Sequence, residues 1–298
     1  MNIPPPRAEL LERERRASRI AGLTALAAVL LFAAGAAASV VGLDSVDGDA
    51  EALVQLHDHS RAVVGQALAG VAIMLLAFPL RFLFGAAANR TDQVRRTFAT
   101  LVVIGPLLLG LGQVMLAIGK DKAADTFVER SATSQTTAGS DSSDSDDDKD
   151  PEEKRAEDTI KDQNLIVASK AVGLAGVLSM IFGMVYTSLW AMRTGLVTRF
   201  WGSLGMAVGA SMIFLGPYGV MIWFAGVGLQ LLGVWPGPRP PAWDTGTAVP
   251  WPQPGEPPGQ GGTVEGRGRE VTDRPADQEQ LERPREPGPP PRKRKRRS

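Results

Sequence analysis

Five uncharged and largely apolar runs constrain this 298-residue chain more than any other feature of its sequence. The hydrocarbon core of a bilayer is about 30 Å thick, and a helix of about 20 apolar residues crosses it. The mean hydropathy of the whole chain, −0.02, hides these runs because the polar residues are gathered between them. The pattern excludes an ordinary water-soluble globular protein. The runs cover 20–43, 62–80, 98–119, 171–192 and 200–238.

The last run is too long for a single span. A continuous helix over 200–238 would measure about 58 Å at 1.5 Å per residue, about twice the thickness of the hydrocarbon core. Gly216-Pro217-Tyr218-Gly219 lies near its middle, where glycine and proline favour a tight turn between two shorter spans. The sequence therefore predicts an all-α integral membrane helical bundle with six transmembrane helices. Their expected bounds are 20–42, 62–84, 98–119, 168–191, 200–216 and 219–235.

The sorting of charge along the chain orients these helices. Lys and Arg prefer the cytoplasmic side of short loops. If the N-terminus is cytoplasmic, the inner segments carry 23 Lys and Arg against 13 Asp and Glu, and the outer segments carry 9 against 19. We therefore predict a multi-pass plasma-membrane protein with both termini in the cytoplasm. A five-span alternative would place the basic end of the tail outside the cell. The inner segments are 1–19, 81–97, 192–199 and 236–298.

The first span allows a second interpretation. An arginine-rich start, an apolar run and Ala36-Ala37-Ala38-Ser39 resemble a signal peptide with a small-residue cleavage site. The apolar run is long for that role. Cleavage would leave five spans without changing the orientation of the others.

The predicted spans divide the chain into five parts. The long outer loop is acidic and partly disordered, because its Ser-, Thr- and Asp-rich centre cannot bury enough apolar area to fold alone. Asp150-Pro151-Glu152-Glu153, near the end of this loop, is typical of a helix start. The parts are a cytoplasmic segment (1–19), the first three helices (20–119), the extracytoplasmic loop (120–164), the last three helices (165–235) and a disordered, proline-rich cytoplasmic tail with a polybasic end (236–298).

Two features of the tail favour contact with the membrane. Trp235, Trp243 and Trp251 are expected at the level of the lipid headgroups, where indole rings accumulate. The terminal basic cluster faces an anionic leaflet, and each basic residue near that surface contributes about 1 kcal/mol. We expect the cluster to contact anionic phospholipids; no specific nucleic acid is predicted, because no aromatic residues alternate with the basic ones. The cluster is Arg292, Lys293, Arg294, Lys295, Arg296 and Arg297.

Glycines recur at helical spacing inside the predicted spans. Small residues let helices approach closely in lipid, where no water is expelled to drive their association. The leading interpretation is tight packing into one bundle, and a glycine-lined path or a homodimer face is the alternative. The residues expected to pack helices are Gly176, Gly183, Gly205, Gly209, Gly226 and Gly233.

Few polar side chains lie at bilayer depth, where ionisable residues usually mark transport or catalysis. Gln66, Gln113 and Gln230 are the amides within the spans, and their expected role is hydrogen bonding between helices. Lys170 and Arg81 lie near span ends, where long side chains reach the interface. No carboxylate lies near a span centre, which argues against an ion-coupled transporter. A continuous polar cavity reaching the glutamines would favour transport, and a close-packed apolar interior would favour an accessory role.

His57-Asp58-His59 is the short motif most typical of a transition-metal site. Residues two apart on a helix point to different faces, and the chain has no third histidine and no cysteine. The acidic run at 141–150 lacks the glycine and terminal glutamate of a calcium-binding loop. The sequence therefore predicts no metal site and no cofactor.

Two stretches carry a resemblance to known proteins. One is the linker around Arg193-Thr194-Gly195-Leu196-Val197-Thr198-Arg199, within 192–205, and the other is the Trp- and Pro-rich segment 235–252. Together they resemble a group of uncharacterised, actinobacterial-type multi-pass membrane proteins of unknown function. The resemblance implies six spans and a basic tail, and no activity or catalytic residue. From the residues alone, Gly195 lets the linker bend, and the second segment forms an extended strap at the inner mouth of the last span.

These features predict a non-catalytic membrane component: a scaffold, an accessory subunit or an envelope-associated protein. An enzyme is not expected, because the sequence has no nucleotide-binding loop, hydrolase elbow or zinc-protease motif. One alternative is a permease or pore for a small molecule or lipid, and another is an outer-surface sensor that uses the acidic loops. The expected partners are the lipid bilayer, anionic phospholipids at the basic tail, and another membrane protein or a second copy of the chain.

Overall fold

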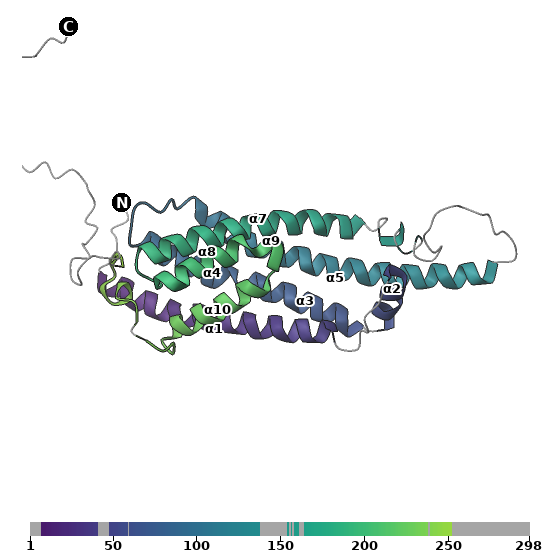
Figure 1. The fold of residues 1–298 in the computed structure, drawn as a ribbon, viewed down its shortest axis with the longest axis horizontal. Helices are drawn as coiled ribbons and strands as arrows, with labels where there is room; N and C mark the ends of the chain where they lie inside the picture. Colours follow the sequence, from purple (N-terminus) through teal and green to yellow (C-terminus); the bar gives the residue numbers. More distant parts are fainter. Residues whose placement is uncertain are drawn as a thin grey trace, which may run out of the picture. The chain divides into compact units, whose positions relative to one another are not determined.

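A computed structural model describes residues 7–40, 48–58, 60–137, 154, 156, 158–160, 164–237 and 239–251. The chain divides into two units, 1–263 and 264–298, and every described residue belongs to the first. The regular elements of this described part are helices, so the all-α class holds there. Figure 1 shows them as a bundle of long, roughly parallel and antiparallel rods.

Within the described residues, four helical segments are long and apolar enough to cross a membrane, namely Glu9–Val40, Arg61–Ala88, Phe98–Ser131 and Asn164–Arg193. They belong to α1 (Arg7–Val40), α3 (Ser60–Leu75) with α4 (Ala77–Ala88), α5 (Phe98–Thr137) and α7 (Asn164–Arg193). The break between α3 and α4 precedes Pro79, which has no N–H and whose ring opposes the carbonyl of residue 75. The chain therefore has the architecture of a multi-pass membrane protein.

The prediction of six transmembrane helices is wrong, because the last two predicted spans are too short. They form a hairpin of α8 (Arg199–Ala210), α9 (Met212–Leu215) and α10 (Tyr218–Leu232). The 15 residues of α10 rise only about 22 Å, less than the hydrocarbon thickness. The sequence argument counted the uncharged residues after Leu232 as helix, although they are not helical. Figure 1 shows the hairpin beside only one half of the long helices.

The turn of this hairpin lies where the sequence predicts it. Gly216 adopts a φ of +61°, a backbone conformation that glycine reaches at little cost, and Pro217 immediately precedes α10. The side chains around the tip are apolar and exposed, with Phe214 87% exposed. In a membrane protein this tip faces lipid.

The two ends of the bundle differ in what covers them (Figure 1). At the strap end, the start of α1 meets the end of α10, and Ser18 Oγ donates to the carbonyl of Leu231 at 2.7 Å. Residues 239–251, which include α11 (Ala242–Thr245), form the strap after which this end is named. At the cap end, α2 (Asp49–Asp58) lies against the outer part of α5.

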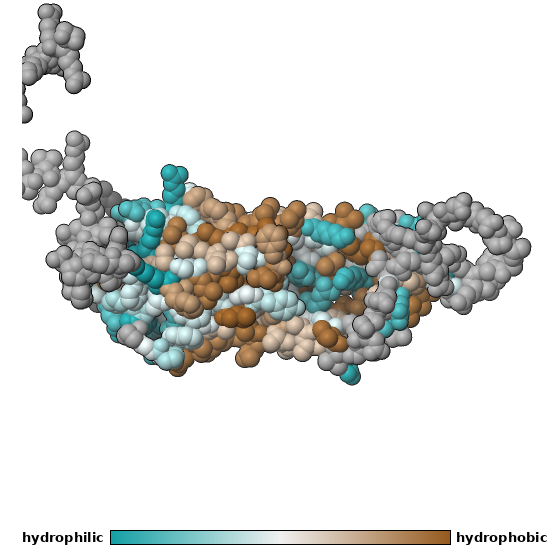
Figure 2. Space-filling view, viewed as in Figure 1, coloured by the Kyte–Doolittle hydropathy of each residue, from teal (hydrophilic) through white to brown (hydrophobic). Residues whose placement is uncertain are grey.

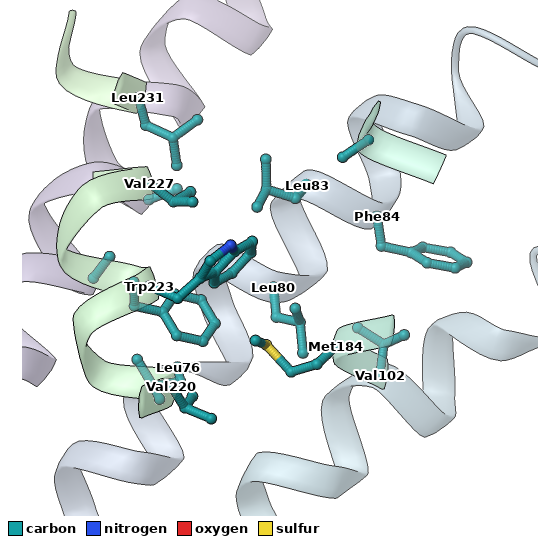
Figure 3. Close-up of a cluster of buried hydrophobic side chains, with 14 of the residues drawn as sticks. Leu76, Leu80, Leu83, Phe84, Val102, Met184, Val220, Trp223, Val227 and Leu231 are labelled. Carbon is teal, nitrogen blue, oxygen red and sulfur yellow. The ribbon is translucent and has the colours of Figure 1, made fainter. Parts of the chain in front are cut away.

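The half of the bundle toward the strap end has a close-packed apolar core. Trp223 of α10 lies beside Leu80 and Leu83 of α4 (Figure 3), and each of these residues is at most 1% exposed. The indole Nε1 of Trp223 donates to the carbonyl of Trp201 at 2.8 Å, which satisfies the one polar atom of that ring. The hairpin thereby completes the core of this half.

The cap end has a second, smaller apolar cluster. Residues 120–164 are predicted as a loop, yet α5 continues through their first part to Thr137. Ala123, Ala124 and Phe127 recur at helical spacing and are buried against Leu53 of α2. The apolar stripe is shorter than a membrane span, so a search for long uncharged runs overlooks it. Ala156 and Ile166 belong to the same cluster, and 138–153 lie outside the described residues.

Large apolar side chains cover the outer surface of the middle of the bundle. Figure 2 shows an apolar band across this region with polar residues toward both ends. Such a surface is unfavourable in water and matches a bilayer, so contact with lipid follows from the candidate spans. The exposed apolar residues of the band include Leu30, Leu68, Phe78, Leu107, Leu111, Leu174, Leu178 and Ile222.

Paired glycines lie where neighbouring helices meet. A Cβ atom at Gly35 of α1 would lie 2.6 Å from the carbonyl oxygen of Gly65 of α3, and the reverse distance is the same. A Cβ at Gly70 of α3 would lie 2.8 Å from the carbonyl of Gly110 of α5, and one at Gly22 of α1 would lie 2.9 Å from that of Gly228 of α10. Backbones that approach this closely leave no room for a side chain.

The glycines expected to pack helices lie in two kinds of position. A Cβ at Gly176 would collide with the backbone of Leu109, and one at Gly209 would lie 2.8 Å from Met184. Gly233 differs, because it ends α10 and has no atom within 4 Å of its added Cβ. The others meet a neighbour: Gly183 meets Val102, Gly205 meets Ser188 and Trp223, and Gly226 meets Trp201.

Gly176→Ala and Gly173→Ala form a matched pair one turn apart on α7. Alanine is favoured over glycine inside a helix by about 1 kcal/mol, and the methyl group of Gly173→Ala meets no atom within 4 Å. That variant is expected to keep or raise thermal stability. Gly176→Ala is expected to lose about 1–3 kcal/mol because its methyl group overpacks against α5. Thermal unfolding in detergent compares them, and equal midpoints would contradict the assigned contact.

Candidate functional site

A partly open cavity of about 970 Å³ lies in the half of the bundle toward the cap end. Helices α1, α3 and α5 form its walls, α2 covers it, and Pro217 and Tyr218 of the hairpin tip line it from the other side. Its volume is at the upper end of the range of ligand-binding cavities, about 300–1,000 Å³. It is the candidate functional site of the described chain.

The short hairpin explains why a cavity forms here. Helices α8 to α10 fill the space beside the long helices only as far as the turn at Gly216, so the remaining half lacks this layer (Figure 1). Phe32 of α1 meets Tyr218 edge to face, with ring centroids 5.5 Å apart, at the boundary between the two halves. Both residues line the cavity, which places its inner limit at the hairpin tip.

Most of the lining residues are apolar, and the polar ones are amides, hydroxyl groups and lysines. Gln66 and Gln113 face the cavity from α3 and α5, and Lys120 and Lys170 line it from α5 and α7. Both lysines are exposed. The described lining residues include no carboxylate and no imidazole, so its formal charge is positive. The apolar lining includes Ala36, Val40, Leu53, Leu56, Ala69, Ile73 and Leu116.

The three glutamines predicted at bilayer depth do not share one cavity. Gln66 and Gln113 reach the cavity, whereas Gln230 does not line it. The hydrogen bond expected for Gln230 is not formed within the described chain, because both atoms of its side-chain amide are buried without a partner there. The cavity is therefore not a continuous polar path along all three glutamines.

The histidine motif ties α2 to α5. His57 Nδ1 lies 2.9 Å from Asp125 Oδ1, and both side chains are exposed. The side chains of Asp58 and His59 lie outside the described residues, as does the acidic run at 141–150. Among the side chains that the structure places, no group of three His, Cys, Asp or Glu could hold a metal ion. His57 thus adds an exposed polar contact between the covering helix of the cavity and α5.

The first part of the predicted tail, residues 239–251, forms a strap, as the Trp- and Pro-rich segment predicts. Trp243 Nε1 donates to the carbonyl of Leu196, and Trp251 Nε1 donates to that of Val197, each at 2.9 Å. The strap therefore packs on the linker between α7 and α8 rather than at the mouth of the last helix. Gly195 bends this linker with a φ of +75°, and a Cβ there would collide with the carbonyl of Val249.

A buried ion pair joins the strap to the bundle. The guanidinium of Arg90 donates to both carboxylate oxygens of Glu14, at 2.7 and 3.1 Å, and to the carbonyls of Ala242 and Ala86. These bonds use the five N–H groups of the arginine. Its side chain is fully buried, and its Cζ lies 5.3 Å from the ring centroid of Trp243. The start of α1, the end of α4 and the strap thus share one polar network.

Sequence reasoning missed several of these residues for identifiable reasons. The orientation argument uses Arg90 and Glu14 only as charges of the predicted inner segments. They lie 76 positions apart, so no local sequence pattern indicates that they pair. Lys120 is taken for a loop residue because α5 is expected to end before it. The helical spacing of Leu53 and Leu56 could have identified α2 as an amphipathic cover. The basic cluster Arg292–Arg297 lies outside the described residues.

Comparison of the chain with protein-family models, with curated proteins and with solved structures finds no match. The interpretation of the cavity and of the strap therefore depends on their own geometry and chemistry.

Replacement of Arg90 tests the buried network. Arg90→Leu leaves the carboxylate of Glu14 buried without its partner and is expected to cost about 3–5 kcal/mol. Arg96→Leu, an exposed position in the same loop, is the control and is expected to change stability by less than about 1 kcal/mol. Thermal unfolding in detergent measures both. The double variant Glu14→Leu with Arg90→Leu is expected to be more stable than Arg90→Leu alone; an equal or lower midpoint would contradict the coupling.

Proposed function

We propose that the protein is a non-catalytic, multi-pass plasma-membrane protein that binds an anionic amphiphile in its cap-end cavity. The observation that carries this proposal is the pairing of an apolar lining with Lys120 and Lys170 in a cavity free of carboxylates among its described residues. An amphiphile here means a molecule with a hydrocarbon part and a negatively charged headgroup.

The chemistry of the lining supports this ligand class. Apolar side chains from three helices can cover a hydrocarbon chain, whose burial contributes about 0.8 kcal/mol per methylene group. The two ammonium groups can form charge-assisted hydrogen bonds with an anionic headgroup. Gln66 and Gln113 offer amide groups deeper along the bundle for ester or hydroxyl oxygens.

The other half of the bundle supports binding over conduction. Trp223, Phe224 and Met184 are at most 1% exposed and fill the interior beyond the hairpin tip. A pore or permease would need this core to open. The accessory role and the transport role thus differ in one respect: whether the bound molecule leaves on the side from which it entered.

The charge distribution supports a cytoplasmic strap end. The hairpin enters and leaves the bundle at the strap end. Four crossings therefore place the same segments on each side of the membrane as the six predicted crossings would. The segments at the strap end and the tail carry 23 Lys and Arg against 13 Asp and Glu, and the remainder of the chain carries 9 against 19. By the preference of Lys and Arg for the cytoplasm, the cavity lies in the outer half of the membrane.

Single cysteines test this orientation, because the chain has none of its own. Gln93→Cys lies in the loop between α4 and α5 at the strap end, and Thr126→Cys lies at a partly exposed position of α5 at the cap end. In intact cells, a membrane-impermeant thiol reagent is expected to label Thr126→Cys and to label Gln93→Cys only after permeabilisation. The opposite pattern would overturn the proposed orientation.

Filling the cavity tests ligand binding. Ala36 lines the cavity, whereas Ala37 is exposed on the neighbouring face of α1. Ala36→Phe is expected to abolish saturable binding of a pyrene-labelled fatty acid to the purified protein, measured by fluorescence. Ala37→Phe is expected to bind as wild type does. Equal binding by both variants, or no saturable binding by wild type, would contradict the proposed function.

Removal of the two lysines tests the charge of the ligand. Lys120→Gln with Lys170→Gln is expected to weaken binding of the labelled fatty acid about tenfold, with less effect on a pyrene-labelled alcohol of the same chain length. Lys122→Gln lies on the same helix outside the lining and is the control. An equal loss for the acid and the alcohol would show that the lysines do not select an anion.

A further inference from the structure

A second, smaller cavity lies at the strap end, between α1 and α4. Its volume is about 390 Å³, and it is separate from the cap-end cavity because the two share no lining residue. Arg13 of α1 and Arg81 of α4 line it together with the partly exposed Phe78 and Phe82. It thus combines two guanidinium groups with an aromatic surface at the boundary between the apolar band and the polar end. We call it the arginine groove.

The two arginines of the groove are available to a ligand. Within the ranges that the structure describes, neither forms an ion pair. The one carboxylate that lines the groove, Glu14, is paired through both oxygens with Arg90 and is only 9% exposed. Asn89 also donates to Glu14 at 3.3 Å. The negative charge nearest the groove is therefore neutralised, and the net charge of the lining is positive.

Gly85 sets the direction of the Arg81 side chain. A Cβ atom at Gly85 would lie 2.9 Å from Nη1 of Arg81, so the guanidinium lies over the glycine one turn further along α4. This directs it toward the end of α4, and Asn89 and Arg13 line the same groove. A side chain at position 85 would displace the guanidinium without touching any other described atom within 4 Å.

The apolar part of the groove is continuous with the lipid-facing surface. Phe78 is 47% exposed and belongs to the apolar band of the bundle. Phe82 stacks on Trp243 of the strap, with ring centroids 5.8 Å apart and planes 7° from parallel. A ligand that lies against Phe78 and reaches the arginines therefore extends from hydrocarbon to the polar end.

We propose that the arginine groove binds the phosphate of an anionic phospholipid, with its acyl chains against Phe78. Arginine forks match phosphate oxygens in geometry and charge, and basic cavities between membrane helices at the cytoplasmic face bind lipid headgroups. The groove has an apolar side for the chains, which a free phosphate ion does not require. This site is independent of the amphiphile cavity and lies at the opposite end of the bundle.

Native mass spectrometry tests the proposal with wild-type protein released from nanodiscs that contain equal amounts of phosphatidylglycerol and phosphatidylcholine. Wild type is expected to retain phosphatidylglycerol over phosphatidylcholine. Arg13→Gln with Arg81→Gln is expected to reduce the retained phosphatidylglycerol about tenfold. Arg15→Gln with Arg96→Gln removes the same charge from exposed positions outside the groove, at the same end, and is expected to retain lipid as wild type does. Equal loss in both double variants would overturn the site in favour of general surface charge.

A third variant separates positioning from charge. Gly85→Ala keeps both arginines and displaces the flexible end of Arg81, so it is expected to lower phosphatidylglycerol retention while the thermal midpoint stays near that of wild type. Retention equal to wild type would contradict the assigned geometry. Competition by inorganic phosphate as strong as competition by phosphatidylglycerol would show that the groove binds a free anion, which would overturn the lipid assignment. Arg13, Arg81 and Gly85 do not line the cap-end cavity, so the difference between each variant and wild type reports on the groove and not on the fatty-acid site.

Discussion

The close approach of helix backbones at glycines is the constraint on which the rest of this structure depends. In lipid, helices gain little by excluding solvent from one another, so contact must come from packing and from polar groups. Gly35 with Gly65, and Gly70 with Gly110, bring α1, α3 and α5 together in sequence, and Gly22 with Gly228 places α10 on α1. A side chain at any of these positions would separate two helices and open the apolar core between them. The strength of the bundle therefore depends on residues that have no side chain.

The cavity exists because the contacts that hold the hairpin on the bundle do not reach the cap end. The hairpin is held on α1 by Gly22 and Gly228 and on α7 by Gly209, and it turns at Gly216 before it reaches the cap end. The four long helices continue beyond this turn without it. The same short element that fills the interior of one half thus leaves a space in the other, and its tip provides one wall of that space. Fold and candidate site have a common origin in the length of α10.

The sequence predicts correctly those features that depend only on the length of an apolar run or on the conformation of a few neighbouring residues. Long uncharged runs predict the four crossing helices, and Gly216 with Pro217 predicts the hairpin turn, because length and local conformation decide these features. The number of crossings is wrong because freedom from charge does not fix where a helix ends. Gly233 ends α10 while the uncharged run continues. A count of uncharged residues therefore overestimates the span.

The features that sequence reasoning missed depend on contacts between distant residues. Arg90 and Glu14 are ordinary loop and terminal charges until the fold buries them together beneath Trp243. The strap has the composition of a disordered tail, yet its tryptophans donate to the carbonyls of Leu196 and Val197, which lie in the linker after the end of α7. Neither the ion pair nor the docking place of the strap has a local signal. Both require the bundle to form first, because the bundle supplies the partners.

The electrostatics of the two ends give the proposed lipid sites different sources of selectivity. The segments around the cap-end cavity are acidic overall, so they repel dissolved anions from the region, whereas the cavity itself presents two lysines. A ligand whose hydrocarbon part partitions into the bilayer reaches the lysines by way of the membrane, where this repulsion is offset by apolar burial. The segments at the strap end are basic overall, so charge alone distinguishes the arginine groove poorly from its surroundings. Selectivity there must come from the geometry of the groove, where Gly85 leaves room for the guanidinium of Arg81.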